Sequence, residues 1–352
     1  MELYKQKLYQ SDLLTAINST VDFCKIFNKS VMITGATGLI GSFLVDMFLY
    51  SNETLNSKIK IYAIGRNYQR LETRFGINDN LIFIEHDVND EINFTYKVDY
   101  IIHAASNAYP EVFDKDPVGT IMSNVLGTKK LLDYGGKNDC KRFLYISSGE
   151  VYGQGDINVD AYKENYSGYI DITNSRSCYP ASKRVAETLC CAYSKQNGLE
   201  TVMVRPCHIF GPNTTNVDNR ANVQFVNNIL KGENIILKSS GSQIRSYCYI
   251  ADCCSGLLTV LLNGKKCESY NLSNNNERIS IARFAEIIAQ LAEKKVLIEN
   301  YDKTLKDQQS PITRQVLDST KLEALGWNAK YSIEHGIENT LKILGIKINN
   351  MR

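Results

Sequence analysis

The run GATGLIG at residues 35–41 places the tightest constraint on how this chain can fold. It follows the apolar stretch SVMIT and precedes the helical pattern SFLVDMFLY. Gly35, Gly38 and Gly41 allow a tight turn, a close approach of the backbone to a pyrophosphate and close packing of the helix on its strand. The spacing is GxxGxxG, not the GxGxxG of simple dehydrogenases. At a first strand–helix junction it predicts a dinucleotide-binding turn.

Short apolar runs rich in Ile, Val and Tyr recur along the first 206 residues and are separated by helical patterns. Continuous apolar strands that alternate with helices are typical of a parallel sheet covered on both faces. We therefore predict an α/β fold built on a Rossmann-type, doubly wound parallel sheet. The expected strands lie at 30–34, 58–65, 81–88, 98–105, 142–148 and 199–206, with a helix at 120–136.

The regular alternation of apolar strands and helices ends beyond residue 206. Residues 211–245 are rich in Asn, Gly and Ser, as in loops, and a helix-rich tail follows. This change predicts a smaller, discontinuous C-terminal substrate domain. The expected division is an N-terminal extension at 1–28, a dinucleotide-binding domain at 29–206 and 246–275, and a substrate domain at 207–245 and 276–352.

Charge and composition exclude several classes of partner. The net charge of +2 gives no electrostatic reason to expect nucleic acid or an anionic membrane surface. The polar start MELYKQKLYQ is unlike a secretory signal, and no apolar run approaches the ~20 residues that cross a bilayer, so we expect a cytoplasmic protein. None of the ten cysteines forms a CxxC and only four histidines are present, so we expect no metal site and reduced, mostly buried thiols.

The second expected strand ends in IGRN, with Gly65 and Arg66 where many NAD-binding chains carry an Asp or Glu for the adenosine ribose. An arginine there can accept the 2′-phosphate of NADP, or it can stack on the adenine of NAD. Asp87, after the third expected strand, is placed to reach the adenine amino group. Arg66 leaves the choice between the two dinucleotides open; we expect NAD, with NADP possible because of Arg66.

Tyr179 is the only one of the 21 tyrosines with a lysine, Lys183, four residues later. On a helix this spacing puts both side chains on one face, and Pro180 suits a first turn. An ammonium near a phenol lowers the phenol pKa, so we expect Tyr179 to exchange protons near neutral pH. An ordinary exposed helix would show the same spacing, and the glycine run is what favours the catalytic interpretation.

Together these segments resemble the extended short-chain dehydrogenase/reductase family of nucleotide-sugar epimerases, dehydratases and decarboxylases. The resemblance covers about residues 29–345, and its motifs follow one another in order. They are GATGLIG, HAAS (103–106), SNVLGT (123–128), SSGEVYG (147–153), YPASK (179–183), RPCHIFGP (205–212), GSQIRSYCYIAD (241–252), YNLSN (270–274) and LGW (325–327).

The resemblance implies a role for each catalytic side chain. Tyr179 is the expected base, Lys183 holds the nicotinamide ribose, and Ser148 shares the proton of the substrate hydroxyl. Such enzymes oxidise a sugar at C4, act on the ketone and often return the hydride. The expected cofactor contacts are Gly35, Thr37, Gly38, Leu39, Ile40, Gly41, Arg66, Asp87, Val88, Ala104, Ala105, Ser106, Asn124, Tyr179, Lys183 and Pro206, and the expected substrate contacts are Ser148, Glu150, His208, Gln224, Phe225, Arg245 and Arg314.

The segment SSGEVYG bears on which reaction to expect. The glucose 4,6-dehydratases of the family carry Asp-Glu before VYG, whereas this chain has Gly149 and keeps Glu150, as the UDP-glucuronate decarboxylases do. RSCY before the active-site helix and Arg245 in QIRSY also resemble those decarboxylases. A C4 ketone β to a carboxylate loses carbon dioxide easily, so oxidation and positioning suffice. We expect a UDP-glucuronate-decarboxylase-like enzyme, with a C3, C4 or C5 epimerase or a 4,6-dehydratase as alternatives and a non-catalytic Rossmann sensor as a remote one.

Two segments depart from the resemblance. SNAYPEVF (106–113) does not match the decarboxylase loop, and Cys207 and His208 stand near where relatives commonly have Asn. His208 either touches the sugar or is a core histidine, and the sequence leaves both open. The resemblance also implies a homodimer that uses helix 120–136 and the Tyr179–Lys183 helix as a four-helix bundle, a nucleotide-diphosphate sugar as substrate, and a part in surface polysaccharide or glycoconjugate synthesis.

Overall fold

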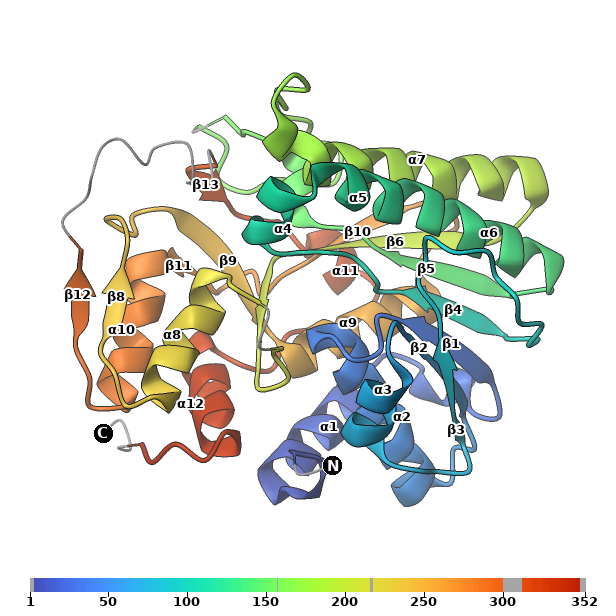
Figure 1. The fold of residues 1–352 in the computed structure, drawn as a ribbon, viewed down its shortest axis with the longest axis horizontal. Coiled ribbons are helices and arrows are strands. Elements are labelled where there is room, and N and C mark those ends of the chain that lie inside the picture. Colours follow the sequence, from blue (N-terminus) through green and yellow to red (C-terminus); the bar gives the residue numbers. More distant parts are fainter. Residues whose placement is uncertain (1–2, 157, 216–217, 300–311, 349–352) are drawn as a thin grey trace.

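The fold is centred on a parallel sheet, seen in a computed structural model that describes residues 3–156, 158–215, 218–299 and 312–348 (Figure 1). Its strands run in the order β10-β6-β5-β4-β1-β2-β3 and every pair is parallel. The order reverses between β1 and β4, which is where ligands bind in such sheets. The strands are β1 (Ser30–Thr34), β2 (Lys60–Gly65), β3 (Leu81–Glu85), β4 (Tyr100–His103), β5 (Arg142–Ile146), β6 (Thr201–Pro206) and β10 (Ser269–Leu272).

Helices cover both faces of this sheet, as the alternating pattern predicted (Figure 1). Val31 and Ile33 of β1 point into one apolar core, whereas Met32 between them belongs to the other. On the first face lie α1 (Lys7–Ser19), η2 (Phe23–Ile26), α2 (Leu39–Leu55), α3 (Tyr68–Phe75) and α9 (Ile250–Asn263). On the second lie α4 (Pro110–Lys115), α5 (Pro117–Met122), the π-helical turn η3 (Ser123–Gly127), α6 (Thr128–Lys137) and α7 (Cys178–Asn197).

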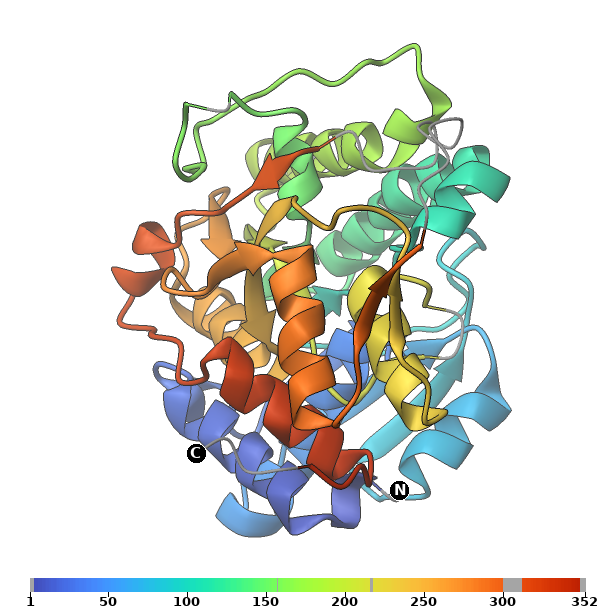
Figure 2. The same cartoon turned by 90° about the vertical axis from the view of Figure 1, so that its left-hand side faces the viewer.

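A smaller part of the molecule lies beside the carboxyl ends of the main strands (Figures 1 and 2). Its larger sheet joins β7 (His208–Phe210), β9 (Ile244–Tyr249), β11 (Arg278–Ser280) and β13 (Arg314–Gln315), and β8 (Ile235–Leu237) pairs with β12 (Val296–Ile298). Helices α8 (Ala221–Leu230), α10 (Ile281–Leu291), α11 (Thr320–Glu323) and α12 (Ile333–Ile343) complete the C-terminal half.

The smaller part is discontinuous, as expected. β9 begins two residues before the predicted boundary at 246 and stays in the small sheet up to Tyr249, whereas β10 joins the main sheet and α9 packs on it. The exact division into domains stays a prediction. No helix in the described ranges is long and apolar enough to cross a membrane.

Helix α1 gives the N-terminal extension a structural place that the sequence did not predict. Asp12 on this helix is 1% exposed and accepts hydrogen bonds from the Tyr249 hydroxyl at 2.6 Å, the Tyr331 hydroxyl at 2.8 Å and the Asn339 amide at 2.8 Å. Burial raises the pKa of the Asp12 carboxyl, and the three donors lower it. The helix packs against α2, α9 and α12, so it ties the helices of the main sheet to the C-terminal part.

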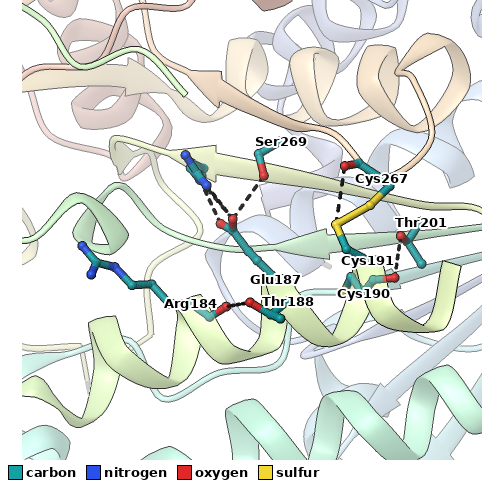
Figure 3. The surroundings of a disulfide bond; sticks show 9 residues. Arg184, Glu187, Thr188, Cys190, Cys191, Thr201, Cys267 and Ser269 are labelled. Carbon is teal, nitrogen blue, oxygen red and sulfur yellow. Dashed lines mark hydrogen bonds and ion pairs between the residues drawn. A yellow bond between two sulfur atoms is a disulfide. The ribbon is translucent and has the colours of Figure 1, made fainter. Parts of the chain in front are cut away.

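The expectation of reduced thiols is wrong for one pair of cysteines. Cys191 of α7 and Cys267, just before β10, form a disulfide (Figure 3). The pairing of β10 with β6 brings the two Cα atoms to 5.1 Å, within the range that a disulfide requires. The sequence could not reveal this because 76 residues separate the two cysteines. The other cysteines are free, and Cys24 is the one among them that is exposed.

Candidate active site

The glycine run forms the turn between β1 and α2, and the structure shows why these positions are glycines. Gly35 has a φ of +68°, and a Cβ there would lie 2.9 Å from the Ala105 backbone. A Cβ on Gly41 would lie 2.3 Å from the carbonyl oxygen of Gly35. The first turn of α2 therefore packs directly against the end of β1, which leaves its amide groups close to a bound pyrophosphate.

A cavity of about 340 Å³ opens at the carboxyl ends of the main strands, beside this turn. Asn124 is not among the lining residues but contacts one of them. Its amide nitrogen donates to the Ser182 hydroxyl at 2.9 Å, and its amide oxygen accepts from the hydroxyl of Ser106, which lines the cavity, at 2.8 Å. The cavity thus brings together nearly every residue expected at the cofactor. They are Gly35, Thr37, Gly38, Leu39, Ile40, Gly41, Arg66, Asp87, Val88, Ala104, Ala105, Ser106, Tyr179, Lys183 and Pro206.

Tyr179 and Lys183 lie in the first two turns of α7 and both line the cavity. The Lys183 ammonium donates to the Ile146 carbonyl at 2.8 Å and lies 5.7 Å from the centre of the Tyr179 ring. Burial lowers the Lys183 pKa to about 7, opposed by the negative charge of Glu187 one turn further along. The lysine is therefore held by the backbone of β5 at the floor of the cavity.

The predicted lowering of the Tyr179 pKa is wrong for the protein without ligands. Burial raises the Tyr179 pKa to about 12 and the Glu150 charge adds to the rise, while Ser148, Arg220 and Arg176 lower it. Desolvation of the phenolate outweighs the nearby cations, because the phenol is buried whereas the lysine points at the Ile146 carbonyl.

Glu150 lies in the 3-10 turn η4 (Gly149–Tyr152), which follows β5 directly. Ser148 caps this turn: its hydroxyl accepts a hydrogen bond from the Glu150 amide at 3.1 Å. The Glu150 carboxylate lies 3.4 Å from Arg176, and Ser148 and Glu150 both line the cavity. The end of the buried strand thus presents a hydroxyl and a carboxylate to the same space as Tyr179.

Arg176 and Phe113 complete this group, and sequence reasoning did not name them as site residues. Arg176, in the 3-10 turn η5 (Ser175–Ser177), lies 4.6 Å above the Phe113 ring. That ring in turn stacks on Tyr179 with centroids 4.6 Å apart. Arg176 stands in the RSCY segment, and Phe113 ends the SNAYPEVF segment. The sequence analysis compared both segments with relatives but gave neither residue a role in the site.

The predicted substrate residues are only partly brought together. His208 lines the cavity; burial lowers its pKa well below the usual value, and the charges of Arg245 and Arg220 lower it further. The other four lie outside the lining. Gln224 is exposed and bonds the Asn219 carbonyl, Phe225 packs in the core, Arg245 donates to the carbonyls of Ile244 and Ile312, and Arg314 pairs with Asp160.

Other side chains line the cavity in their place, in the part where the resemblance leads us to expect the sugar and which we call the sugar end. They come from the segment after β7, from β13 and from the segment before α4, none of which carries a motif. Arg220 forms an ion pair with Asp218 at 2.6 Å. The additional residues at this end are Tyr109, Thr215, Asp218, Arg220 and Gln315. Among the described residues, no three His, Cys, Asp or Glu side chains gather in a way that could hold a metal ion.

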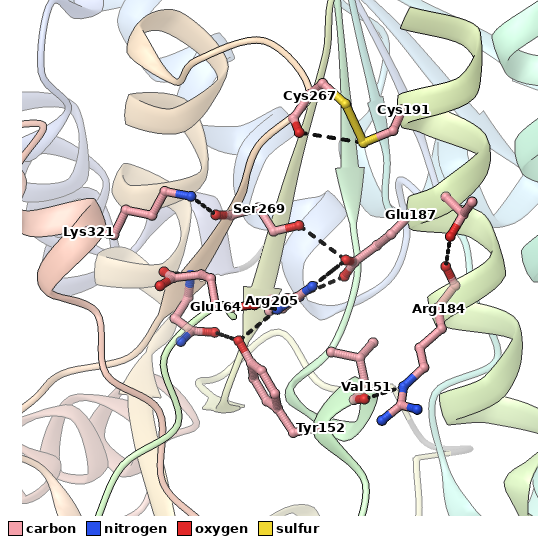
Figure 4. A network of polar contacts seen from close by, with 12 residues as sticks. Val151, Tyr152, Glu164, Arg184, Glu187, Cys191, Arg205, Cys267, Ser269 and Lys321 are labelled. Carbon is pink, nitrogen blue, oxygen red and sulfur yellow. Dashed lines mark hydrogen bonds and ion pairs between the residues drawn. A yellow bond between two sulfur atoms is a disulfide. The ribbon is translucent and has the colours of Figure 1, made fainter. Parts of the chain in front are cut away.

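A buried polar network supports the catalytic elements from behind (Figure 4). The Arg205 guanidinium donates to the Glu187 carboxylate at 2.6 Å, to the Tyr152 hydroxyl at 2.9 Å and to the Glu164 carbonyl at 2.8 Å. Ser269 also donates to Glu187, at 3.1 Å (Figures 3 and 4). Arg205 therefore connects α7, the turn that carries Glu150 and the segment around Glu164.

Comparisons with known proteins agree with this arrangement. Residues 31–273 match the model of a family described as the NAD dependent epimerase/dehydratase family. The chain is 33% identical over 314 residues to UDP-glucuronic acid decarboxylase 1 of Xenopus tropicalis, covering 89% of this chain and 71% of that protein. It is also 33% identical over 310 residues to UDP-glucuronic acid decarboxylase 6 of Arabidopsis thaliana, covering 88% of this chain and 87% of the relative.

Solved structures show the same fold at lower identity. An epimerase from Methanothermobacter thermautotrophicus superposes with a TM-score of 0.80 at 20% identity, covering 94% of this chain and 95% of that one. The UDP-glucuronic acid 4-epimerase of Bacillus cereus, solved with UDP-glucuronic acid and NAD, has a TM-score of 0.74 at 21% identity and covers 90% and 99%. The predicted α/β fold with a Rossmann-type sheet is therefore confirmed.

Proposed function

The chain belongs to the NAD-dependent epimerase/dehydratase family of nucleotide-sugar enzymes, and from that premise we propose that it oxidises C4 of UDP-glucuronate and then removes the C6 carboxylate as carbon dioxide. The observation that carries the proposal is the turn after β5, with one carboxylate, Glu150, beside Tyr179 and against Arg176. The curated relatives at 33% identity that are named UDP-glucuronic acid decarboxylases support the same substrate.

The residues of this chain supply the proton chemistry of the first step. A nicotinamide cofactor held at the Gly35–Gly41 turn and beside Lys183 would supply the hydride acceptor for C4. Tyr179 accepts the proton of the C4 hydroxyl, with Ser148 sharing it and Lys183 holding the site beneath. The resulting ketone is β to the C6 carboxylate.

The second step breaks the C5–C6 bond. Carbon dioxide leaves, the electron pair of the broken bond forms the C4–C5 enolate, and a proton drawn from water is delivered to C5 through Glu150. Return of the hydride to C4, with Tyr179 giving its proton back to the C4 oxygen, would then complete a product that has lost carbon dioxide alone. Arg176 supplies positive charge where the sugar carboxylate must sit, since its guanidinium already lies 3.4 Å from one carboxylate, that of Glu150. Phe113 stacks on Tyr179 and lies beneath the guanidinium, which keeps the arginine beside Glu150.

The packing at Gly149 argues against dehydration. A Cβ at this position would lie 3.2 Å from Leu317 and 3.3 Å from both the Gln315 amide and the Pro206 carbonyl. A second acid beside Glu150 would have to displace these neighbours. Epimerisation is the second candidate, because a single carboxylate near a C4 ketone can also remove a proton from an adjacent carbon.

The test is mass spectrometry of the products formed from UDP-glucuronate, with Tyr179→Phe as the inactive control. The proposal predicts a sugar nucleotide lighter by one carbon dioxide, formed by the wild type and not by the variant. An isomer of unchanged mass would identify an epimerase, and loss of water would identify a dehydratase; either would overturn the decarboxylase assignment.

We also propose a homodimer. Four apolar side chains on α5, η3 and α7 are exposed, namely Val118 at 63%, Met122 at 41%, Leu126 at 44% and Val185 at 47%. These helices lie side by side on one face of the sheet (Figure 1). Light scattering should give twice the mass of one chain, and Met122→Glu with Val185→Glu should give the mass of one chain. A wild-type monomer would contradict the proposal.

A further inference from the structure

The N-terminal helix α1 lies ahead of the residues that match the family model, which begin at residue 31. It packs against α2, the helix that follows the glycine turn (Figure 1). Tyr9 of α1 is 0% exposed, so its hydroxyl is buried together with its ring. A hydroxyl buried in this way is stabilising only through the hydrogen-bond partners that it meets.

The Tyr9 hydroxyl has a partner on each side. It donates to the Asp46 carboxylate of α2 at 2.7 Å, and Asp46 also forms an ion pair with Arg74 of α3. Burial raises the pKa of Tyr9 well above its ordinary value and the Asp46 charge adds to the rise, so the hydroxyl keeps its proton. Because that proton points at Asp46, the Tyr9 oxygen is left to accept a hydrogen bond, and it accepts one from the Asn213 amide nitrogen at 2.6 Å.

Asn213 belongs to the part of the chain that builds the sugar end. It lies between Ile209 and Thr215, which both line the cavity. Asn213 is buried, and its amide nitrogen donates to the Ser42 hydroxyl of α2 at 3.1 Å as well as to Tyr9. Its amide oxygen meets no hydrogen-bond partner among the described residues. The amide nitrogen therefore carries all the hydrogen bonds that fix this side chain in the described structure.

We propose that Tyr9 is a positioning residue for the sugar nucleotide, because it holds Asn213 and thereby the chain between Ile209 and Thr215 at the sugar end. Tyr9 does not line the cavity, so it acts through Asn213 and not by touching the substrate. A chain of hydrogen bonds with a fixed direction sets the position of a segment more narrowly than apolar packing does. The inference rests on the proposed function, since it takes this end of the cavity to bind the sugar.

Tyr9→Phe removes the hydroxyl and keeps the ring. KM for UDP-glucuronate should rise about fivefold, the effect of about one hydrogen bond. The value of kcat should stay within about twofold, because no group that reacts with the substrate is changed. The Kd for NAD should also stay within about twofold, since the Ser42 amide still donates to the Gly38 carbonyl of the glycine turn at 2.9 Å. Steady-state rates and calorimetry measure these three quantities.

Tyr331→Phe is the matched control. It removes another buried hydroxyl that donates to a carboxylate in the contacts of α1, that of Asp12 at 2.8 Å, and it leaves Asn213 untouched. KM for UDP-glucuronate should stay within about twofold in this variant. An equal rise in KM for both variants would overturn the inference, because it would show that any loosening of α1 has the same effect.

Asn213→Ala tests whether Tyr9 acts through Asn213. This variant should raise KM at least as much as Tyr9→Phe, and the double variant should raise it no further, because Tyr9 then has no amide left to hold. Two effects that multiply in the double variant would overturn the inference. If Tyr9→Phe fails to fold, Asn213→Ala carries the test, and a KM within about twofold of the wild type would then overturn it.

Hydrogen exchange followed by mass spectrometry separates this inference from the proposed substrate, because it needs no substrate. The amides of residues 209–215 should exchange faster in Tyr9→Phe than in the wild type, and Tyr331→Phe should leave their exchange unchanged. Unchanged exchange in Tyr9→Phe would overturn the inference whatever the substrate is. Faster exchange together with no reaction of the wild type on UDP-glucuronate would support the role of Tyr9 and reject the proposed substrate.

Discussion

The two ends of the cavity differ in how they are built. The cofactor end consists of strand-to-helix turns of the main sheet, such as Gly35–Gly41 after β1 and Ala104–Ser106 after β4. The sugar end consists of the segment before α4 with Tyr109, the segment after β7 with Arg220, and Gln315 of β13. The cofactor end therefore follows from a topology that many proteins share, whereas the sugar end depends on how this chain folds back over its own sheet.

The largest expected effect lies where the two ends meet. Tyr179→Phe removes the proton acceptor and should lower kcat by about 10²–10⁴-fold, the usual contribution of a positioned acid or base. The Kd for the dinucleotide should stay within about twofold, because the phenol hydroxyl contributes little next to the glycine turn. Steady-state rates measure kcat, and calorimetry measures the Kd for the dinucleotide. A large loss of dinucleotide binding would contradict the view that Tyr179 serves the reaction and the glycine turn holds the dinucleotide.

The polar network around Arg205 should contribute to the free energy of unfolding. Arg205→Ala leaves the buried Glu187 carboxylate without its guanidinium, which should cost about 3–5 kcal/mol in the free energy of unfolding. Arg278→Ala is the matched control, since its pair with Asp160 is exposed and should contribute less than about 1 kcal/mol. Denaturant unfolding compares them, and equal losses would show that the network in Figure 4 has no special weight.

Lys183 offers a pH-dependent test at the cofactor end. Its pKa is about 7 in the folded, unliganded protein, against the ordinary lysine value of 10.5, so the folded state has already given up a proton between these values. The cost of the buried charge is therefore full below about pH 7 and disappears as the pH rises toward about 10.5.

Lys183→Met removes that cost. The melting temperature of the unliganded variant should exceed that of the wild type at about pH 6, and the difference should shrink at about pH 9. Lys195→Met, at the exposed end of α7, serves as the control and should show no such trend. A difference for Lys183→Met that grew with pH would mean that folding raises the Lys183 pKa, which is the opposite of the lowering caused by burial.

The smallest effects should fall at the sugar end and distinguish two glutamines. Gln315→Ala changes a residue that lines the cavity and should raise KM for the sugar nucleotide about tenfold, the cost of about one hydrogen bond. Gln224→Ala changes an exposed residue bonded to the Asn219 carbonyl and should leave KM within about twofold. A larger rise in KM for Gln224→Ala than for Gln315→Ala would mean that Gln224 contacts the substrate, as the sequence predicted, and that Gln315 does not.

The sequence motifs predicted the cofactor end because the backbone conformation there can be formed only by particular residue types. Gly35 must adopt a positive φ and Gly41 must touch the Gly35 carbonyl, so both are visible as glycines in the sequence. Tyr179 and Lys183 share one helix, so their spacing predicts their proximity. At the sugar end, Gln315 reaches the cavity only because β13 pairs with β9, a contact across about 70 residues that no local pattern encodes.

The same reason explains what was missed elsewhere. Arg176 meets Glu150 from a separate turn 26 residues away, and Cys191 meets Cys267 only after β10 has joined β6. Burial decided the Tyr179 pKa, and burial is a property of the packed molecule that the Tyr–Lys spacing does not carry.

The most direct test of the account follows reduced nicotinamide and carbon dioxide in one sample of Glu150→Gln mixed with UDP-glucuronate. In the proposed mechanism, oxidation belongs to Tyr179 and Lys183, and Glu150 acts only after carbon dioxide has left. The account predicts that this variant reduces its cofactor and releases carbon dioxide in its first turnover, but then holds the cofactor reduced and turns over far more slowly than the wild type. A variant that cannot reduce the cofactor, or that turns over at the wild-type rate, would contradict it.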